Sequence, residues 1–110
     1  MSTPEQAQDK LLRLQDMQEK IESFRIQIER IKNELEELER AIEALTSEEQ
    51  KEVYQFLGKI MIKREKDAIL TELKERQEFL KLRQSGLQKQ LEKLEEKAKE
   101  LENEIRETIR

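Results

Sequence analysis

The sequence predicts a mainly α fold, in which two long helices form an antiparallel coiled-coil hairpin with one short β-hairpin between them. Apolar residues repeat at heptad spacing through the first and last parts of the chain, and the repeat stops between residues 46 and 67. Of the 110 residues, 44% are Asp, Glu, Lys or Arg, two are Gly and one is Pro, which is typical of long helices with this repeat. Disorder is the alternative, but it calls for a large net charge, whereas 22 basic and 26 acidic residues leave −4.

The first helix is expected over residues 4–46. Thr3, Pro4 and Gln6 have the residue types of a capping box, with proline at the position where its missing N–H costs nothing. Ten apolar residues then follow at alternating intervals of three and four, which places them on one seam of a coiled coil. They are Leu14, Met17, Ile21, Phe24, Ile28, Ile31, Leu35, Leu38, Ile42 and Leu45.

The second helix is expected over residues 66–109 and continues the same spacing. Its seam positions are Leu70, Leu73, Gln77, Leu80, Gln84, Leu87, Leu91, Leu94, Ala98, Leu101, Ile105 and Thr108. In an antiparallel arrangement, every seam position of the first helix meets one of the second, starting with Leu14 opposite Leu101. Beyond Leu14 the match stops, because Lys10 falls opposite Ile105. We therefore expect the seam to end before the helices do and the outer turns to splay.

The segment between the helices has a different character. Residues 46–50 resemble a capped helix start and are expected to form one short helical turn. A β-hairpin is expected over residues 52–63, with Gly58 as the first central residue of a type II′ turn. Both faces of this hairpin are apolar, and an isolated hairpin is marginally stable in water, so its strands are expected to assemble with strands of other subunits into a larger sheet or a β-barrel. The expected interface residues are Val53, Tyr54, Phe56, Leu57, Gly58, Ile60, Met61 and Ile62.

The composition also disfavours several kinds of function. The chain contains no Cys and no His, which argues against thiol nucleophiles, imidazole catalysis, soft-metal sites and disulfides, and an intracellular location is expected. The first residues show no basic stretch followed by an apolar core, so no signal peptide is expected. No apolar run is long enough for a membrane span, and an acidic pI near 5.2 argues against nucleic acid as the main partner. An enzyme is disfavoured, since the carboxylates lie on solvated helix faces, and no catalytic residue, metal or cofactor is expected.

In order and length, these segments resemble a prefoldin subunit of the β type, similar to those of archaea. The most specific part of the resemblance is residues 54–63, with an aromatic residue, a glycine turn and an aliphatic strand that ends in lysine. Lys66-Asp67 and Glu72-Leu73 follow at the start of the second helix. A single hairpin favours the β type, since α subunits carry two hairpins and are longer. The resemblance implies a single prefoldin-like domain over residues 1–110.

The resemblance also implies a function. Prefoldins of this kind form a hexamer of two α and four β subunits, α2β4, whose hairpins build β-barrels from which the coiled coils extend. The resemblance implies a cytoplasmic chaperone, a holdase, that binds non-native client proteins at the coiled-coil tips without ATP. It would prevent their aggregation and hand them to a group II chaperonin.

Apolar residues are left over at the free ends of the helices. Leu11 and Leu12 cannot both face Ile105, so some apolar surface should stay open there. The residues expected to bind clients are Leu11, Leu12, Leu101, Ile105 and Ile109. Frayed helix ends are the alternative interpretation, since single exposed leucines are common. The alternative function is a passive coiled-coil scaffold or adaptor that binds one folded partner.

Four further residues have plain structural interpretations. Gln77 and Gln84, on the second seam, favour a role in setting helix register over a polar recognition site. Phe79 and Leu82 lie off the seam on the second helix, and flank packing is favoured there over a client patch or a lateral subunit contact.

Overall fold

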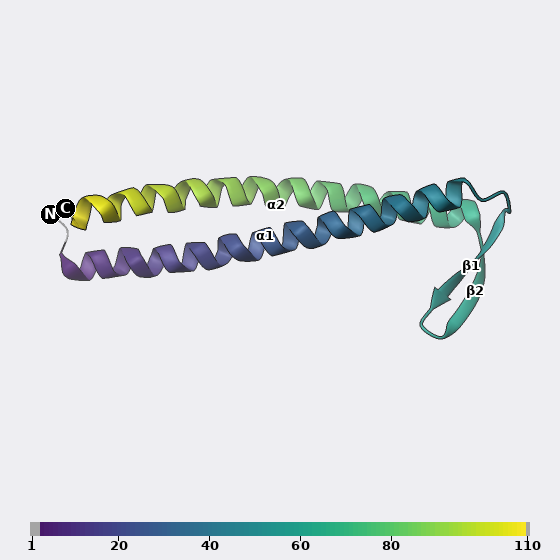
Figure 1. Ribbon diagram of the computed structural model, residues 1–110, viewed down its shortest axis with the longest axis horizontal. Coiled ribbons are helices and arrows are strands. Elements are labelled where there is room, and N and C mark those ends of the chain that lie inside the picture. Colours follow the sequence, from purple (N-terminus) through teal and green to yellow (C-terminus); the bar gives the residue numbers. More distant parts are fainter. Residues whose placement is uncertain (1–2, 110) are drawn as a thin grey trace. The chain divides into compact units, whose positions relative to one another are not determined.

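The chain consists of two long α-helices joined by a two-stranded antiparallel sheet, which confirms the predicted fold class (Figure 1). The computed structural model describes residues 3–109. Helix α1 spans Pro4–Thr46, strand β1 Glu52–Leu57, strand β2 Ile60–Glu65 and helix α2 Lys66–Ile109. The helices have the predicted bounds, whereas the second strand runs two residues beyond the predicted end of the hairpin and meets α2 directly.

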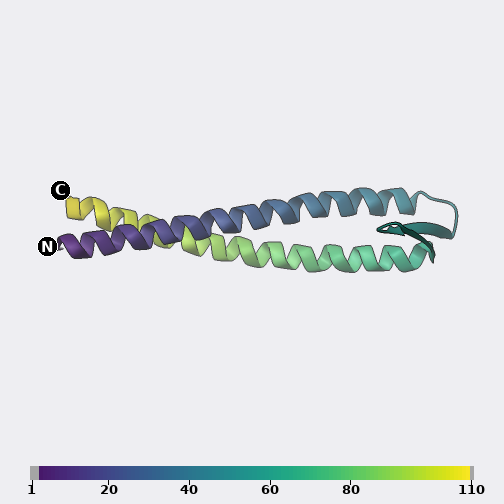
Figure 2. The same ribbon diagram turned by 90° about the horizontal axis from the view of Figure 1, so that it is seen from below.

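The chain divides into two compact units. One, the terminal unit, holds the described residues up to Arg30 together with those from Gln84 onwards. The other, the hairpin unit, is Ile31–Arg83 and contains the end of α1, the β-hairpin and the start of α2. Within each unit, a stretch of α1 runs antiparallel beside a stretch of α2, as Figures 1 and 2 show from two directions.

The predicted seam forms the core of the terminal unit. Ile21, Leu91 and Ala98 are buried together, and partly buried side chains of the same seam pack against them. These are Leu14, Met17, Phe24, Ile28 and Leu94. Ion pairs lie at the edges of the seam, where the Lys10 Nζ lies 3.6 Å from a Glu104 carboxylate oxygen and the Arg25 Nη2 lies 3.4 Å from a carboxylate oxygen of Glu95. The core is therefore a strip along the helices, as heptad spacing requires.

The predicted capping box begins α1. The backbone N–H of Thr3 donates to Gln6 Oε1 at 3.0 Å, and the N–H of Gln6 donates to Thr3 Oγ1 at 3.2 Å. Two backbone donors of the first turn, which have no partner inside the helix, are satisfied in this way.

The hairpin unit continues the seam with a different balance of polar contacts. Its buried apolar residues are Ile31, Ile42, Ile69 and Leu80. Gln77 is half-buried, and its Nε2 donates to Glu39 Oε2 at 2.7 Å, which links α2 to α1. Near it, the Arg76 Nη2 lies 3.2 Å from Glu34 Oε1. Gln77 thus makes a contact between the helices, as a residue that sets their register would.

The connection between α1 and β1 corrects one prediction. Residues 48–50 contain no helix, so the expected short helical turn is wrong. Ser47 instead hydrogen-bonds to carbonyls in the last turn of α1. Its Oγ donates to the Ala44 carbonyl at 3.1 Å, and its backbone N–H donates to the Glu43 carbonyl at 3.1 Å. The Ser47 hydroxyl therefore serves the end of α1 and does not begin another helix, because hydroxyl side chains satisfy free carbonyls as readily as free amides.

The two strands pair from Glu52 opposite Glu65 to Leu57 opposite Ile60. Gly58 and Lys59 form the turn. Gly58 has a φ of 62°, and it is the one residue of the described chain with a positive φ. A positive φ at the first central residue alone is the signature of the predicted type II′ turn.

Candidate functional site

The β-hairpin exposes most of its apolar side chains. Six large apolar residues on it have between 40% and 72% of their surface open to solvent. They are Tyr54, Phe56, Leu57, Ile60, Met61 and Ile62. The strand register places Tyr54, Phe56 and Met61 on one face, and nothing in the described chain covers that face. A contiguous apolar surface of this kind on a small chain marks a place where another protein binds.

The opposite face of the hairpin lies toward α2 and is partly covered. Val53, Gln55 and Arg64 project from this face and are half-buried. The predicted interface residues therefore divide into two groups, an open face around Phe56 and a face that is shielded near the helix and open near the turn.

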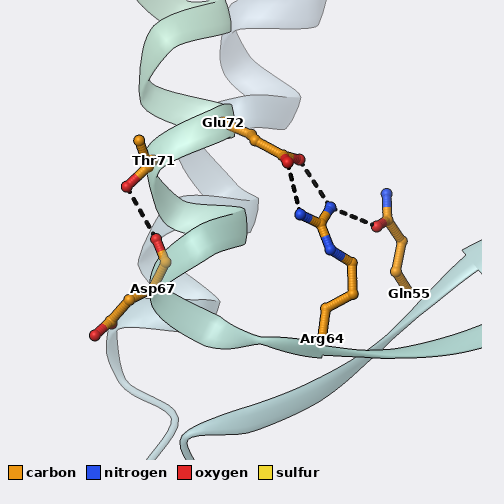
Figure 3. A network of polar contacts seen from close by, with 5 residues as sticks. All are labelled: Gln55, Arg64, Asp67, Thr71 and Glu72. Atoms are coloured by element: carbon orange, nitrogen blue, oxygen red, sulfur yellow. Dashed lines mark hydrogen bonds and ion pairs between the residues drawn. The ribbon is translucent and has the colours of Figure 1, made fainter.

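Arg64 makes the main polar contact between the hairpin and α2. Its Nη2 donates to Glu72 Oε1 at 2.6 Å, and its Nη1 donates to Glu72 Oε2 at 2.8 Å and to Gln55 Oε1 at 3.0 Å (Figure 3). The hydrogen bonds from Arg64 hold the pKa of Glu72 below its ordinary value, and the same bonds raise the pKa of Arg64. Sequence reasoning missed this network, because no local pattern pairs a strand residue with a helix residue eight positions later.

Two lysines fix the base of the hairpin. The backbone N–H of Lys66 donates to the Lys51 carbonyl at 2.7 Å, and its Nζ donates to the Glu48 carbonyl at 2.7 Å. On the strands, the Lys63 Nζ lies 3.1 Å from Glu52 Oε2, and this hydrogen bond is the main cause of the raised pKa of Lys63. The start of α2 is thus held against the linker, although no Ser or Thr caps it.

At the outer end of the terminal unit, the predicted client-binding residues separate into two kinds. Leu11 and Leu12 have 46% and 55% of their surface exposed, whereas Leu101 and Ile105 are buried, with 4% and 7% exposed. Ile109 is the last residue of α2, and its side chain lies outside the described residues. Only Leu11 and Leu12 therefore offer open apolar surface among the members of the set that the structure describes.

The burial of Ile105 shows that the expectation of a seam ending at Leu14 is wrong. Lys10, expected opposite Ile105, has only 24% of its side chain exposed, and its Nζ pairs with Glu104. A lysine can bury its aliphatic stem along an apolar surface while its ammonium group reaches solvent or a carboxylate. Lys10 therefore occupies a seam position, and the outer turns stay packed.

Three other large apolar side chains are exposed on the helices, namely Ile26, Phe79 and Leu82. The Arg76 guanidinium lies over the Phe79 ring at 5.5 Å from its centroid, so this aromatic residue has an intrahelical partner. Leu82 is the most exposed, with 76% of its surface open. Phe79 is also exposed, with 53% of its surface open, so the single chain does not bury either residue as the expected flank packing requires.

The described residues offer little for small-molecule chemistry. Within residues 3–109, Asp and Glu do not gather in groups of three or more that would hold a metal ion. An open groove beside Leu12 is lined mainly by polar and charged residues, Gln6, Asp9, Lys10, Arg13 and Asp16. Neither helix, in the part of the chain that the structure describes, has a stretch apolar enough to cross a membrane.

A family model described as "Prefoldin subunit" matches residues 8–110. The chain belongs to the prefoldin subunit family. The prefoldin subunit beta of Methanothrix thermoacetophila is 32% identical over 107 residues, which cover 96% of this chain and 89% of that protein. The prefoldin subunit beta of Methanosarcina barkeri is 31% identical over 107 residues, covering 96% of this chain and 92% of that protein.

A solved structure supports the same assignment. The crystal structure of the prefoldin beta subunit from Thermococcus strain KS-1 matches with a TM-score of 0.86 and 33% sequence identity, and the match covers 99% of this chain and 96% of that one. The chain is thus a prefoldin-type chaperone subunit of the β type, in a family of non-enzymatic proteins. Prefoldin beta subunits assemble with other prefoldin subunits.

Proposed function

We propose that this chain is one of four β subunits in a cytoplasmic α2β4 prefoldin hexamer that holds non-native proteins without ATP and passes them to a group II chaperonin. Assembly occurs through the β-hairpin, and client binding occurs at the outer ends of the helices. The observation that carries the proposal is that the β-hairpin exposes six large apolar side chains and that Leu11 and Leu12 are exposed near the start of α1.

The hairpin supports the assembly part of the proposal. Its exposed residues lie on both strands, and a two-stranded sheet presents two unpaired backbone edges in addition to them. Edges and apolar faces together favour strand addition by other subunits, because pairing satisfies the backbone groups while it removes the side chains from water.

The two leucines support the client part. Each has about half of its surface still open, so a client that covered it would gain on the order of 1 kcal/mol. Contacts this weak cannot hold a protein singly. Several tips that engage one chain at the same time act through effective concentration, which suits clients without a defined shape.

The client part can be tested with serine substitutions in the assembled hexamer. Leu11→Ser together with Leu12→Ser should leave the hexamer intact by native mass spectrometry but lower its ability to suppress light scattering by a denatured client diluted without ATP. At about 1 kcal/mol per leucine and several tips per client, we expect at least tenfold more hexamer to be needed. Leu82→Ser is the matched control, since Leu82 is at least as exposed but lies in the hairpin unit.

The outcomes separate the proposal from its alternatives. Unchanged suppression by the double variant, or an equal loss with Leu82→Ser, would refute client binding at Leu11 and Leu12. No suppression by the unaltered hexamer would favour a passive scaffold. Truncation after residue 100 is a poorer test, because it also removes the buried Leu101 and Ile105 and would disturb the core.

The assembly part has its own measurement. The chain alone has a mass of 13.3 kDa. Native mass spectrometry of the chain mixed with an α-type subunit should show a defined hexamer of two α and four β subunits, and a mixture without such a species would contradict the proposed stoichiometry.

A further inference from the structure

The joint between the hairpin and α2 contains no linker. Strand β2 ends at Glu65 and α2 begins at Lys66, whereas β1 is joined to α1 through residues 47–51. The direction in which the hairpin leaves α2 therefore depends on the backbone dihedrals of one or two residues and on the side chains that bridge the corner. Rotation by a few tens of degrees at this point would move the turn at Gly58 by many ångströms, because strands rise about 3.3 Å per residue.

Arg64 is the side chain that bridges this corner. It lies on β2, its paired contact Glu72 lies in the second turn of α2, and its third partner Gln55 lies on β1. Figure 3 shows the guanidinium between the two partners, with the helix on one side and the strands on the other. Three elements thus meet at one planar group, and a bidentate arginine–carboxylate pair fixes direction as well as distance.

The other polar contacts at the corner do not join the hairpin strands to the body of α2. Lys66 holds the start of α2 to the linker through its N–H and its Nζ, but both acceptors, on Lys51 and Glu48, precede the strands. The pair between Lys63 and Glu52 lies within the hairpin itself. Among the polar contacts of the described chain, those of Arg64 join the hairpin strands to the body of α2.

We propose that Arg64 is a positioning residue that fixes the direction of the β-hairpin relative to α2 and so presents it in the orientation that subunit assembly needs. The inference rests on the proposed role of the hairpin as the assembly interface. Its physical basis is preorganisation: a hairpin that swings about its joint must be ordered when it pairs with other subunits, and this ordering lowers affinity. The ion pair is partly exposed, with 27% and 56% of the two side chains open, so its contribution to folding is small by comparison.

The direction of the hairpin can be measured in the full chain. Because the sequence contains no cysteine, cysteines introduced at Lys59 in the turn and at Lys74 on α2 take spin labels at those sites only. Pulsed electron–electron double resonance should give a narrow distribution of label-to-label distances when Arg64 is present. The distribution should be clearly broader with Arg64→Met, which keeps an unbranched side chain but removes the guanidinium.

Arg76→Met is the matched control. Arg76 also pairs with a glutamate, Glu34, and lies in the same unit, but its ion pair and its ring contact are with helix residues, Glu34 and Phe79. We expect Arg64→Met to weaken assembly with an α-type subunit by about fivefold, because a hairpin without this contact must be ordered when it binds. Arg76→Met should leave the distance distribution and assembly unchanged, and the helical circular dichroism and Tm of the two variants should agree. A narrow distribution with Arg64→Met, or equal changes in both variants, would overturn the proposal.

A charge swap guards against the case in which Arg64→Met simply unfolds the hairpin. Arg64→Glu combined with Glu72→Arg restores an ion pair across the same corner, and the amide of Gln55 can donate where its oxygen now accepts. The double variant should recover the narrow distribution and most of the affinity, whereas Arg64→Glu alone should not. A swap that recovers neither counts against the proposal.

A separate variant distinguishes failure of this inference from failure of the proposed function. Phe56→Glu places a charge on the open face of the hairpin, away from Arg64, where Phe56 is 72% exposed. If Phe56→Glu leaves assembly intact, the hairpin is not the interface, and both proposals fall. If Phe56→Glu abolishes assembly while Arg64→Met leaves it unchanged, the interface stands and the positioning role of Arg64 is refuted.

Discussion

Replacing Leu101 by alanine should destabilise the chain by about 3 kcal/mol, whereas the same change at Leu12 should cost less than about 1 kcal/mol. Leu101 has 4% of its surface exposed, so the substitution removes three buried carbons, worth about 0.8 kcal/mol each, and adds a cavity term because the seam cannot fully close. Leu12 is 55% exposed, so less than half of its transfer free energy is at stake and no cavity forms.

The assay is urea unfolding of the full chain, followed by circular dichroism at 222 nm at one fixed protein concentration. The concentration is held constant because any association through the hairpin would add to the apparent stability. The midpoint should fall for Leu101→Ala with little change in the dependence on urea, since a lower midpoint at constant slope reports a loss of stability. Leu82→Ala, at a more exposed position on α2, is the control and should behave like Leu12→Ala.

Leu101→Ala also decides whether Leu101 packs in the core or contacts clients. If it acts by packing, Leu101→Ala should retain suppression of client aggregation at a temperature where the variant is folded. A cost below about 1 kcal/mol for Leu101→Ala, together with loss of client holding, would refute the packing role and restore Leu101 as a client contact.

Three further outcomes are expected. Because Arg64 lowers the pKa of Glu72, the stability from this pair is present above the ordinary glutamate pKa of about 4.3 and is lost as the pH falls through the lower folded pKa; carbon-detected NMR titration should find the Glu72 pKa returned to its ordinary range in Arg64→Met. Gly58→Ala should destabilise the hairpin by about 1 kcal/mol and weaken assembly, because alanine disfavours a φ of 62° although its Cβ would meet no atom within 4 Å; equal assembly would contradict this. Cysteines at Ile21 and Leu94, which belong to one core cluster, should crosslink within one chain, and links only between chains would be inconsistent with the hairpin.

The parts of the fold that sequence reasoning predicted are those fixed by local rules. Heptad spacing placed the seam residues that form the core of the terminal unit, and the capping box at Thr3 and the glycine turn at Gly58 are short motifs whose geometry follows from residue type. Each of these signals has a fixed interval along the chain. The bounds of both helices could be predicted for the same reason, since the heptad pattern stops where the strands begin.

The features that sequence reasoning missed depend on contacts between side chains that lie far apart in the sequence or on different elements. Treating Lys10 as the end of the seam counted its charge and ignored its four-carbon stem, and so Ile105 was expected to be open when it is buried. The contact of Arg64 with Glu72 could not be predicted from the sequence, because it depends on the angle between β2 and α2, and that angle is set by tertiary structure.

The exposed hairpin couples the folding of the chain to its assembly. Two strands are marginally stable by themselves, and here one face gains only partial cover near α2 while Phe56 and its neighbours stay open. Partner subunits that bind the folded hairpin and not the unfolded one stabilise it by mass action, so its order should rise with the concentration of partners. The capping box and the seam, by contrast, are satisfied within the chain. The helices therefore do not depend on assembly, and, with the hairpin as the proposed interface, a free subunit carries a marginally stable element at that interface.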